Sequence, residues 1–145
     1  MSLALAFRTA ARKAKERNWD KIYVAVDWHD VICESNYSED GAYGFIEDAI
    51  PALQEASHNK AICLILYSCS YIATAEDFMR HCRKKYGINF DYFNCNPEVK
   101  NTNYGEFGKK FYYDLLLDDK AGFDASTDWG VFASHMEIFF GDCYE

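Results

Sequence analysis

The run Ile22-Tyr23-Val24-Ala25-Val26-Asp27 is a hydrophobic stretch that stops abruptly at a carboxylate. A second run, Leu115-Leu116-Leu117-Asp118-Asp119, ends in the same way at two carboxylates. Near-continuous apolar runs of this kind are typical of buried parallel strands. In open α/β sheets the ligand crevice lies just beyond the carboxyl ends of the strands. If these two strands are neighbours, the three carboxylates converge there and either bind a hard cation such as Mg2+ or repel one another.

Helical and extended segments alternate along the rest of the chain. We expect helices over residues 3–17, 43–58 and 73–86, and strands over 21–27, 61–67, 90–93 and 112–117. Residues 128–140 are compatible with a strand, a helix or both, and Pro51 marks a kink or a second helix start. The alternation predicts an α/β fold, a three-layer sandwich of Rossmann type with a central, mainly parallel sheet and right-handed crossovers. The length suits one domain over residues 1–145, with residues 1–18 as an N-terminal helical extension.

The charge of the chain is unevenly spread. The formal net charge of -8 argues against general nucleic-acid binding, which needs clustered Lys and Arg. Basic side chains crowd the first stretch, namely Arg8, Arg12, Lys13, Lys15, Arg17 and Lys21. The favoured interpretation is a solvated basic helix that complements the acidic body. The alternative is a contact with another copy of the chain or with an anionic partner.

The cysteine pattern and the hydropathy indicate in which cellular compartment the protein is expected. Six cysteines are present, without a CxxC pair or the Cys/His spacing of a zinc site. Reduced thiols in a cytoplasmic protein are therefore the expectation. No segment approaches the roughly 18 apolar residues of a membrane span, so no membrane association is expected.

Two further polar residues accompany the three carboxylates. Ser68 follows the expected strand 61–67, and Lys110 lies just before the expected strand 112–117. A carboxylate such as Asp27 can accept a phosphoryl group covalently, while a bound cation neutralises charge. A Ser hydroxyl and a Lys ammonium can hold the remaining phosphoryl oxygens. The set therefore favours phosphate chemistry.

This order of residues resembles the haloacid dehalogenase-like (HAD) superfamily. The matching motifs are Val26-Asp27-Trp28-His29-Asp30, Leu66-Tyr67-Ser68, Lys110 and Leu117-Asp118-Asp119, within residues 21–132. The stretch around the acidic pair, followed by Asp128-Trp129-Gly130, is similar to small hydrolases of that family. The resemblance implies a phosphatase with Asp27 as nucleophile, Ser68 and Lys110 on the phosphoryl group, and Mg2+ held by Asp27, Asp118 and Asp119. Lys109 and Lys100 are rivals for the lysine role.

One position departs from the pattern of the family. The first motif of the family is Asp-x-Asp, and its second Asp is the general acid/base. Here His29 stands at the position of that second Asp, and Asp30 stands where the family usually has Gly. The family residue at the His29 position gives its backbone carbonyl to the metal, so a metal role for His29 survives the change. His29 can also supply a proton, because its ordinary pKa of about 6.5 suits acid/base work. Asp30 is the other candidate for that role.

Three functional classes follow from these observations. The first is a Mg2+-dependent phosphatase acting on a phosphorylated substrate. The second is a module that binds metal and phosphate but has lost turnover through His29. The third is a response-regulator receiver, ranked last because its acidic pair follows the first strand and its phosphoacceptor lies mid-chain. The intervals between motifs leave no space for a separate cap domain, and such capless sites are open or are closed by another subunit of a homo-oligomer.

Overall fold

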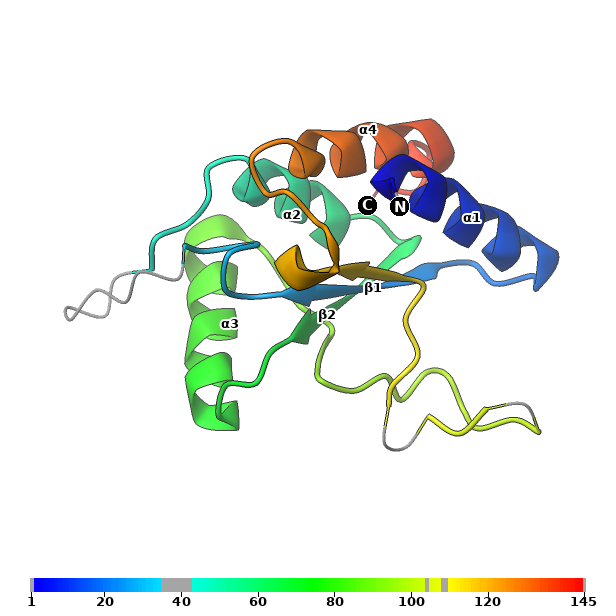
Figure 1. Ribbon diagram of the computed structural model, residues 1–145, viewed down its shortest axis with the longest axis horizontal. Coiled ribbons are helices and arrows are strands. Elements are labelled where there is room, and N and C mark those ends of the chain that lie inside the picture. Colours follow the sequence, from blue (N-terminus) through cyan, green and yellow to red (C-terminus); the bar gives the residue numbers. More distant parts are fainter. Residues whose placement is uncertain (1, 35–42, 104, 108–109, 145) are drawn as a thin grey trace.

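The computed structural model describes residues 2–34, 43–103, 105–107 and 110–144. Its elements follow in the order α1 (Leu3–Glu16), β1 (Ile22–Asp27), α2 (Ala49–Ser57), β2 (Ile62–Tyr67), α3 (Ile72–Tyr86), β3 (Tyr92–Phe93), β4 (Leu115–Leu117), the short 3-10 helix η1 (Asp119–Ala121) and α4 (Asp128–Phe140). The strands form a four-stranded sheet of order β3-β2-β1-β4 in which every pair is parallel. The expected α/β class is confirmed, with helices flanking a parallel sheet in an arrangement compatible with a Rossmann-like sandwich (Figure 1).

Three sequence-based boundaries were wrong. The helix expected from residue 43 begins at Ala49, because residues 43–48 instead run beside 32–34 through bonds such as Glu34 N–H to the Gly44 carbonyl (2.8 Å). Pro51 then falls in the first turn of α2, where a missing N–H costs nothing. The strands expected over 90–93 and 112–117 shorten to β3 and β4. Residues 128–140 are entirely helical.

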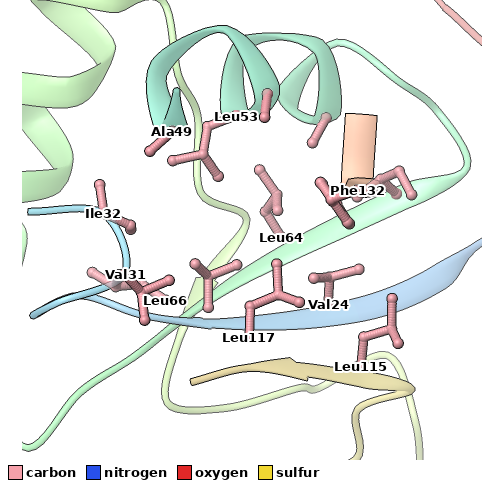
Figure 2. Packing of buried hydrophobic residues seen from close by; sticks show 14 of the residues in the cluster. Val24, Val31, Ile32, Ala49, Leu53, Leu64, Leu66, Leu115, Leu117 and Phe132 are labelled. Carbon is pink, nitrogen blue, oxygen red and sulfur yellow. The ribbon is translucent and has the colours of Figure 1, made fainter. Parts of the chain in front are cut away.

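One face of the sheet carries the main hydrophobic core. Alternate residues of the strands, including Val24, Leu64 and Leu117, point from that face toward α2 and α4 (Figure 2). Helices α1, α2 and α4 lie together on this side of the sheet (Figure 1). The stretch expected as an N-terminal extension therefore belongs to the core, since Phe7, at 0% exposure, packs edge-on against Phe132.

The opposite face of the sheet is covered mainly by aromatic side chains, which come from connecting segments and from β3. Tyr23, Cys63 and Ile65 form a second small core there. The partly buried side chains packed on it are Trp19, Tyr92, Val99, Phe111 and Tyr112. Because side chains alternate along a strand, the odd-numbered positions of β1 face this second core. Within the described ranges, no helix is both long and apolar enough to cross a bilayer.

The short edge strands are lengthened by carboxylate side chains. Asp114 donates its N–H to the Tyr23 carbonyl (2.7 Å), and its Oδ2 accepts the N–H of Tyr23 (2.8 Å). At the opposite edge of the sheet, Asp91 donates its N–H to the Leu64 carbonyl (2.8 Å), and its Oδ2 accepts the N–H of Leu64 (2.8 Å). Burial raises the pKa of the Asp114 carboxyl despite bonds from Tyr112 and Tyr23 that favour its charge. The side chains thus satisfy strand N–H groups that no neighbouring strand reaches.

We expect Asp114→Ala to lower the free energy of unfolding by about 1–3 kcal/mol, because the buried N–H of Tyr23 loses its acceptor. Urea denaturation measures the effect. Asp77→Ala is the matched control, since it removes only an exposed ion pair with Arg80 and should cost less than about 1 kcal/mol. Equal losses in the two variants would contradict the assigned role of Asp114.

Candidate functional site

The strand order creates a topological switch point between β1 and β4. From β1 the chain moves to β2 and β3 on one side, and it then returns to the other side of β1 as β4. Ligands of open α/β sheets bind beyond the carboxyl ends of the strands at such a point. Val26 pairs with Leu117, so Asp27 and Asp118 follow as the next residues of the two strands. The carboxylates expected to converge therefore leave the sheet at its predicted crevice.

The three carboxylates form one compact group. One oxygen from each of Asp27, Asp118 and Asp119 lies within 4.8 Å of the others. The Asp118 carboxylate also caps η1, accepting the N–H of Lys120 at 3.0 Å, and this contact fixes its direction. Across the part of the chain that the structure describes, it is the one cluster of three or more His, Cys, Asp or Glu suited to a metal ion. All-oxygen carboxylate ligands are the set that hard divalent cations prefer.

The protein environment disfavours a fully ionised group. Burial raises the pKa of Asp27 to about 7, with further contributions from the negative charge of Asp118 and from Asp119. The N–H of Trp28, which Asp27 Oδ1 accepts at 2.9 Å, opposes the shift only in part. A cation or a proton relieves this repulsion, so the residues present fit a bound divalent ion.

Ser68 lies next to this group, but its hydroxyl makes its hydrogen bonds within its own loop. Asp27 pairs in register with Tyr67, so Ser68 is the first residue beyond the ladder. Its buried hydroxyl accepts the N–H of Ser70 at 3.1 Å and lies 2.8 Å from the Ser70 hydroxyl. Sequence reasoning identified Ser68 and passed over Ser70, although the Ser-x-Ser spacing is the available signal for such a turn.

Asn94 is a second residue that sequence reasoning passed over. Its side chain holds the backbone of Ser68 from both sides, accepting the N–H at 3.0 Å and donating to the carbonyl at 2.6 Å. Its φ of 51° lies in the left-handed region, which Asn tolerates better than most residues. Asn94 follows β3 directly, and an Asn at a strand end was the only sequence signal for this role.

His29 and Asp30 belong to a tight turn after β1. The Trp28 carbonyl accepts N–H groups from Ile32 (3.0 Å) and Cys33 (3.1 Å), and Asp30 takes a φ of 63°. The His29 ring stacks on the buried Trp28 ring, with centroids 4.7 Å apart and planes 14° apart. Its imidazole is outside the carboxylate group, so a metal role of His29 through the backbone carbonyl stays a prediction.

The candidate lysines are not joined to the carboxylates. Lys110 and Lys100 are exposed, and neither forms an ion pair with a described acidic residue. Lys109 lies outside the described residues. The structure thus brings together Asp27, Asp118 and Asp119, with Ser68 on the adjoining strand end, and leaves the lysine role as a prediction.

Comparisons with family models, with curated proteins and with solved structures gave no significant match. The interpretation of the site therefore depends on its own residues and geometry.

The raised pKa of Asp27 predicts a pH-dependent stability in metal-free protein. Between the ordinary Asp value of about 3.9 and the folded value of about 7, the folded chain binds more protons than the unfolded chain, so stability falls as pH rises through that window. Asp27→Asn removes this penalty. We expect the variant to be more stable than the parent chain near pH 8 by on the order of 1 kcal/mol, discounted because solvent screens this partly exposed group.

The measurement is chemical denaturation with chelator present, from about pH 4 to about pH 8. The advantage of Asp27→Asn should disappear toward the acidic end. Asp142→Asn, an exposed carboxylate near the C-terminus, serves as the control. Parallel stability curves for the parent chain and Asp27→Asn would show that Asp27 ionises without this penalty.

Proposed function

We propose that this chain is a Mg2+-dependent phosphohydrolase that uses Asp27 as its nucleophile. The observation that carries the proposal is the convergence of Asp27 with Asp118 and Asp119 within 4.8 Å at the switch point of the sheet. Ser68, on the adjoining strand end, supports a phosphoryl site beside them. Together with the order of motifs along the chain, this geometry supports membership of the HAD superfamily in its capless form.

Asp27, Asp118 and Asp119 are the residues that would hold the metal ion. The ion, when bound, neutralises charge between the carboxylates and the phosphoryl oxygens. The chain's own contribution is to aim Asp27 and Asp118 from paired strand ends. The N–H of Trp28 orients one Asp27 oxygen at 2.9 Å.

The proposed reaction has two balanced steps. The Asp27 oxygen forms a bond to phosphorus while the bond from phosphorus to the ester oxygen breaks, and that leaving oxygen takes up one proton. Water then attacks phosphorus and loses a proton, the bond to Asp27 breaks, and inorganic phosphate departs. In this proposal the Ser68 hydroxyl, which lies 2.8 Å from the Ser70 hydroxyl, would donate to a phosphoryl oxygen.

The source of the proton separates this proposal from its alternative. His29 is the first candidate, and Asp30 is the second. The stacking of His29 on Trp28 at 4.7 Å favours the second function, a module that binds metal and phosphate without turnover, because the imidazole packs on an aromatic ring and is not a member of the carboxylate group. The left-handed φ of Asp30 is one that Gly also adopts, which agrees with Gly at this position in the family.

We expect hydrolysis of an aryl phosphate to need Mg2+ and to fall to background in Asp27→Asn, because the nucleophile is gone. His29→Ala should retain Mg2+ binding and lose about 10²-fold or more in rate if His29 is the acid. Steady-state kinetics with Mg2+ and with chelator measure both effects.

His29→Asp decides between the two functions. Turnover that appears only in this variant would identify the parent chain as a binding module. Full activity in Asp27→Asn would exclude the covalent mechanism altogether.

Magnesium binding can be measured without turnover. At a Mg2+ concentration about a hundred times its Kd, we expect a gain of about 2.7 kcal/mol in the free energy of unfolding. Asp118→Asn should lose most of that gain because it removes one ligand of the group, whereas Asp142→Asn should keep it. The same gain in all three proteins would show that the ion binds elsewhere.

A further inference from the structure

A row of aromatic rings lies beside the carboxylate group. The ring of Tyr67, which is 37% exposed, lies 6.0 Å from that of Phe111, and Phe111 lies 5.8 Å from Tyr113. Phe111 and Tyr113 are only partly buried. Tyr67 is one of the few exposed large hydrophobic side chains among the described residues, and the partly buried rings of Phe111 and Tyr113 continue the row from it. An exposed ring that continues into other aromatic rings offers a π-face to a ligand.

The row is continuous with the proposed phosphoryl site. Tyr67 is the register partner of Asp27 on the adjacent strand, so their backbones are one strand spacing of about 4.8 Å apart. Paired residues of neighbouring strands point to the same face, and for Asp27 and Tyr67 this is the face of the second small core. A group attached to a phosphate at Asp27 would therefore meet Tyr67 first and Phe111 next.

The far end of the row borders a hollow that can receive part of a ligand. Its lining includes Phe107, Lys110, Phe111 and Tyr113, and its volume is about 380 Å³. That volume lies in the range of about 300–1,000 Å³ typical of small-molecule sites. Lys110, which the sequence predicted as a phosphate ligand, lines this hollow and forms no ion pair with the described acidic residues. A cation in this position can contact an aromatic ring or an anionic substituent of a ligand.

We propose that the Tyr67–Phe111–Tyr113 row binds the planar aromatic part of a phosphate monoester whose phosphate is held at Asp27. This inference rests on the proposed function, because it identifies the substrate class of the same site. A nucleobase and a simple aryl group share the required chemistry. Because Tyr67 is the register partner of Asp27 and Phe111 lies one ring farther along the row, we expect a ring bonded directly to the ester oxygen to contact Tyr67 and a ring spaced by a sugar to contact Phe111.

The test compares three phosphate monoesters: a nucleoside 5′-monophosphate, phenyl phosphate and glycerol phosphate. Phe111→Leu and Tyr67→Leu keep apolar packing and remove the aromatic face. We expect kcat/KM for a ring-bearing substrate to fall about tenfold, mainly through KM, while glycerol phosphate is unaffected. If Phe111→Leu lowers kcat/KM mainly for the nucleotide, the bound ring is a nucleobase. If Tyr67→Leu lowers kcat/KM mainly for phenyl phosphate, the bound ring is a simple aryl group. Phe139→Leu, at an aromatic on α4 that is 40% exposed, is the matched control.

Calorimetric binding of the same compounds in the presence of Mg2+ separates this inference from the phosphatase proposal. If the chain hydrolyses all three substrates and neither variant distinguishes them, the aromatic site is excluded and the phosphatase stands. If no ester is hydrolysed but the nucleotide or phenyl phosphate binds and is weakened by Phe111→Leu or Tyr67→Leu, the aromatic site stands and the phosphatase fails. Absence of both turnover and ring-dependent binding overturns both.

Discussion

The central strand β1 must have its backbone satisfied on both sides, and the rest of the fold depends on this constraint. β2 pairs with all six residues from Ile22 to Asp27, whereas β4 pairs only with Val24 to Val26. A buried N–H without an acceptor costs free energy, so the missing part of the ladder needs a substitute. At the start of β1, the side chain of Asp114 supplies the missing acceptor. At the other end, β1 and β4 stop pairing, and the carboxylates of Asp27, Asp118 and Asp119 lie there.

The alternation of side chains along β1 joins stability to chemistry. Val24 and Val26 point into the main core, and Asp27 points to the opposite face at the carboxyl edge. A slip of the register by one residue would exchange these faces and bury the carboxylate among the helices. The burial of Val24 and Val26 in the main core therefore also fixes where Asp27 points. The same alternation puts Tyr67 next to Asp27 on the face of the second small core.

The sequence could predict those parts of the molecule that depend on local pattern. Apolar runs ending in Asp predicted β1 and β4, and they predicted the convergence of the carboxylates on the condition that the two strands are neighbours. The pairing of β1 with β4 meets that condition. The contacts of Asn94 with Ser68 and of Asp114 with Tyr23 could not be predicted, since each joins residues far apart in the chain. The missing helix over 43–48 has the same cause: its apolar spacing was helical, yet pairing with 32–34 satisfied its backbone instead.

The three carboxylates make the site costly to fold and specific in what it can bind. Burial and the charges of Asp118 and Asp119 raise the pKa of Asp27 to about 7, so near neutral pH the group is poised between holding a proton and losing it. A divalent cation bound there would compete with that proton, and the free energy of its binding would offset the repulsion that folding imposes. Under the proposed function, the ion that relieves this repulsion would also leave Asp27 ionised and able to act as a nucleophile. Metal binding, stability and chemistry would then all depend on a single arrangement at the end of β1.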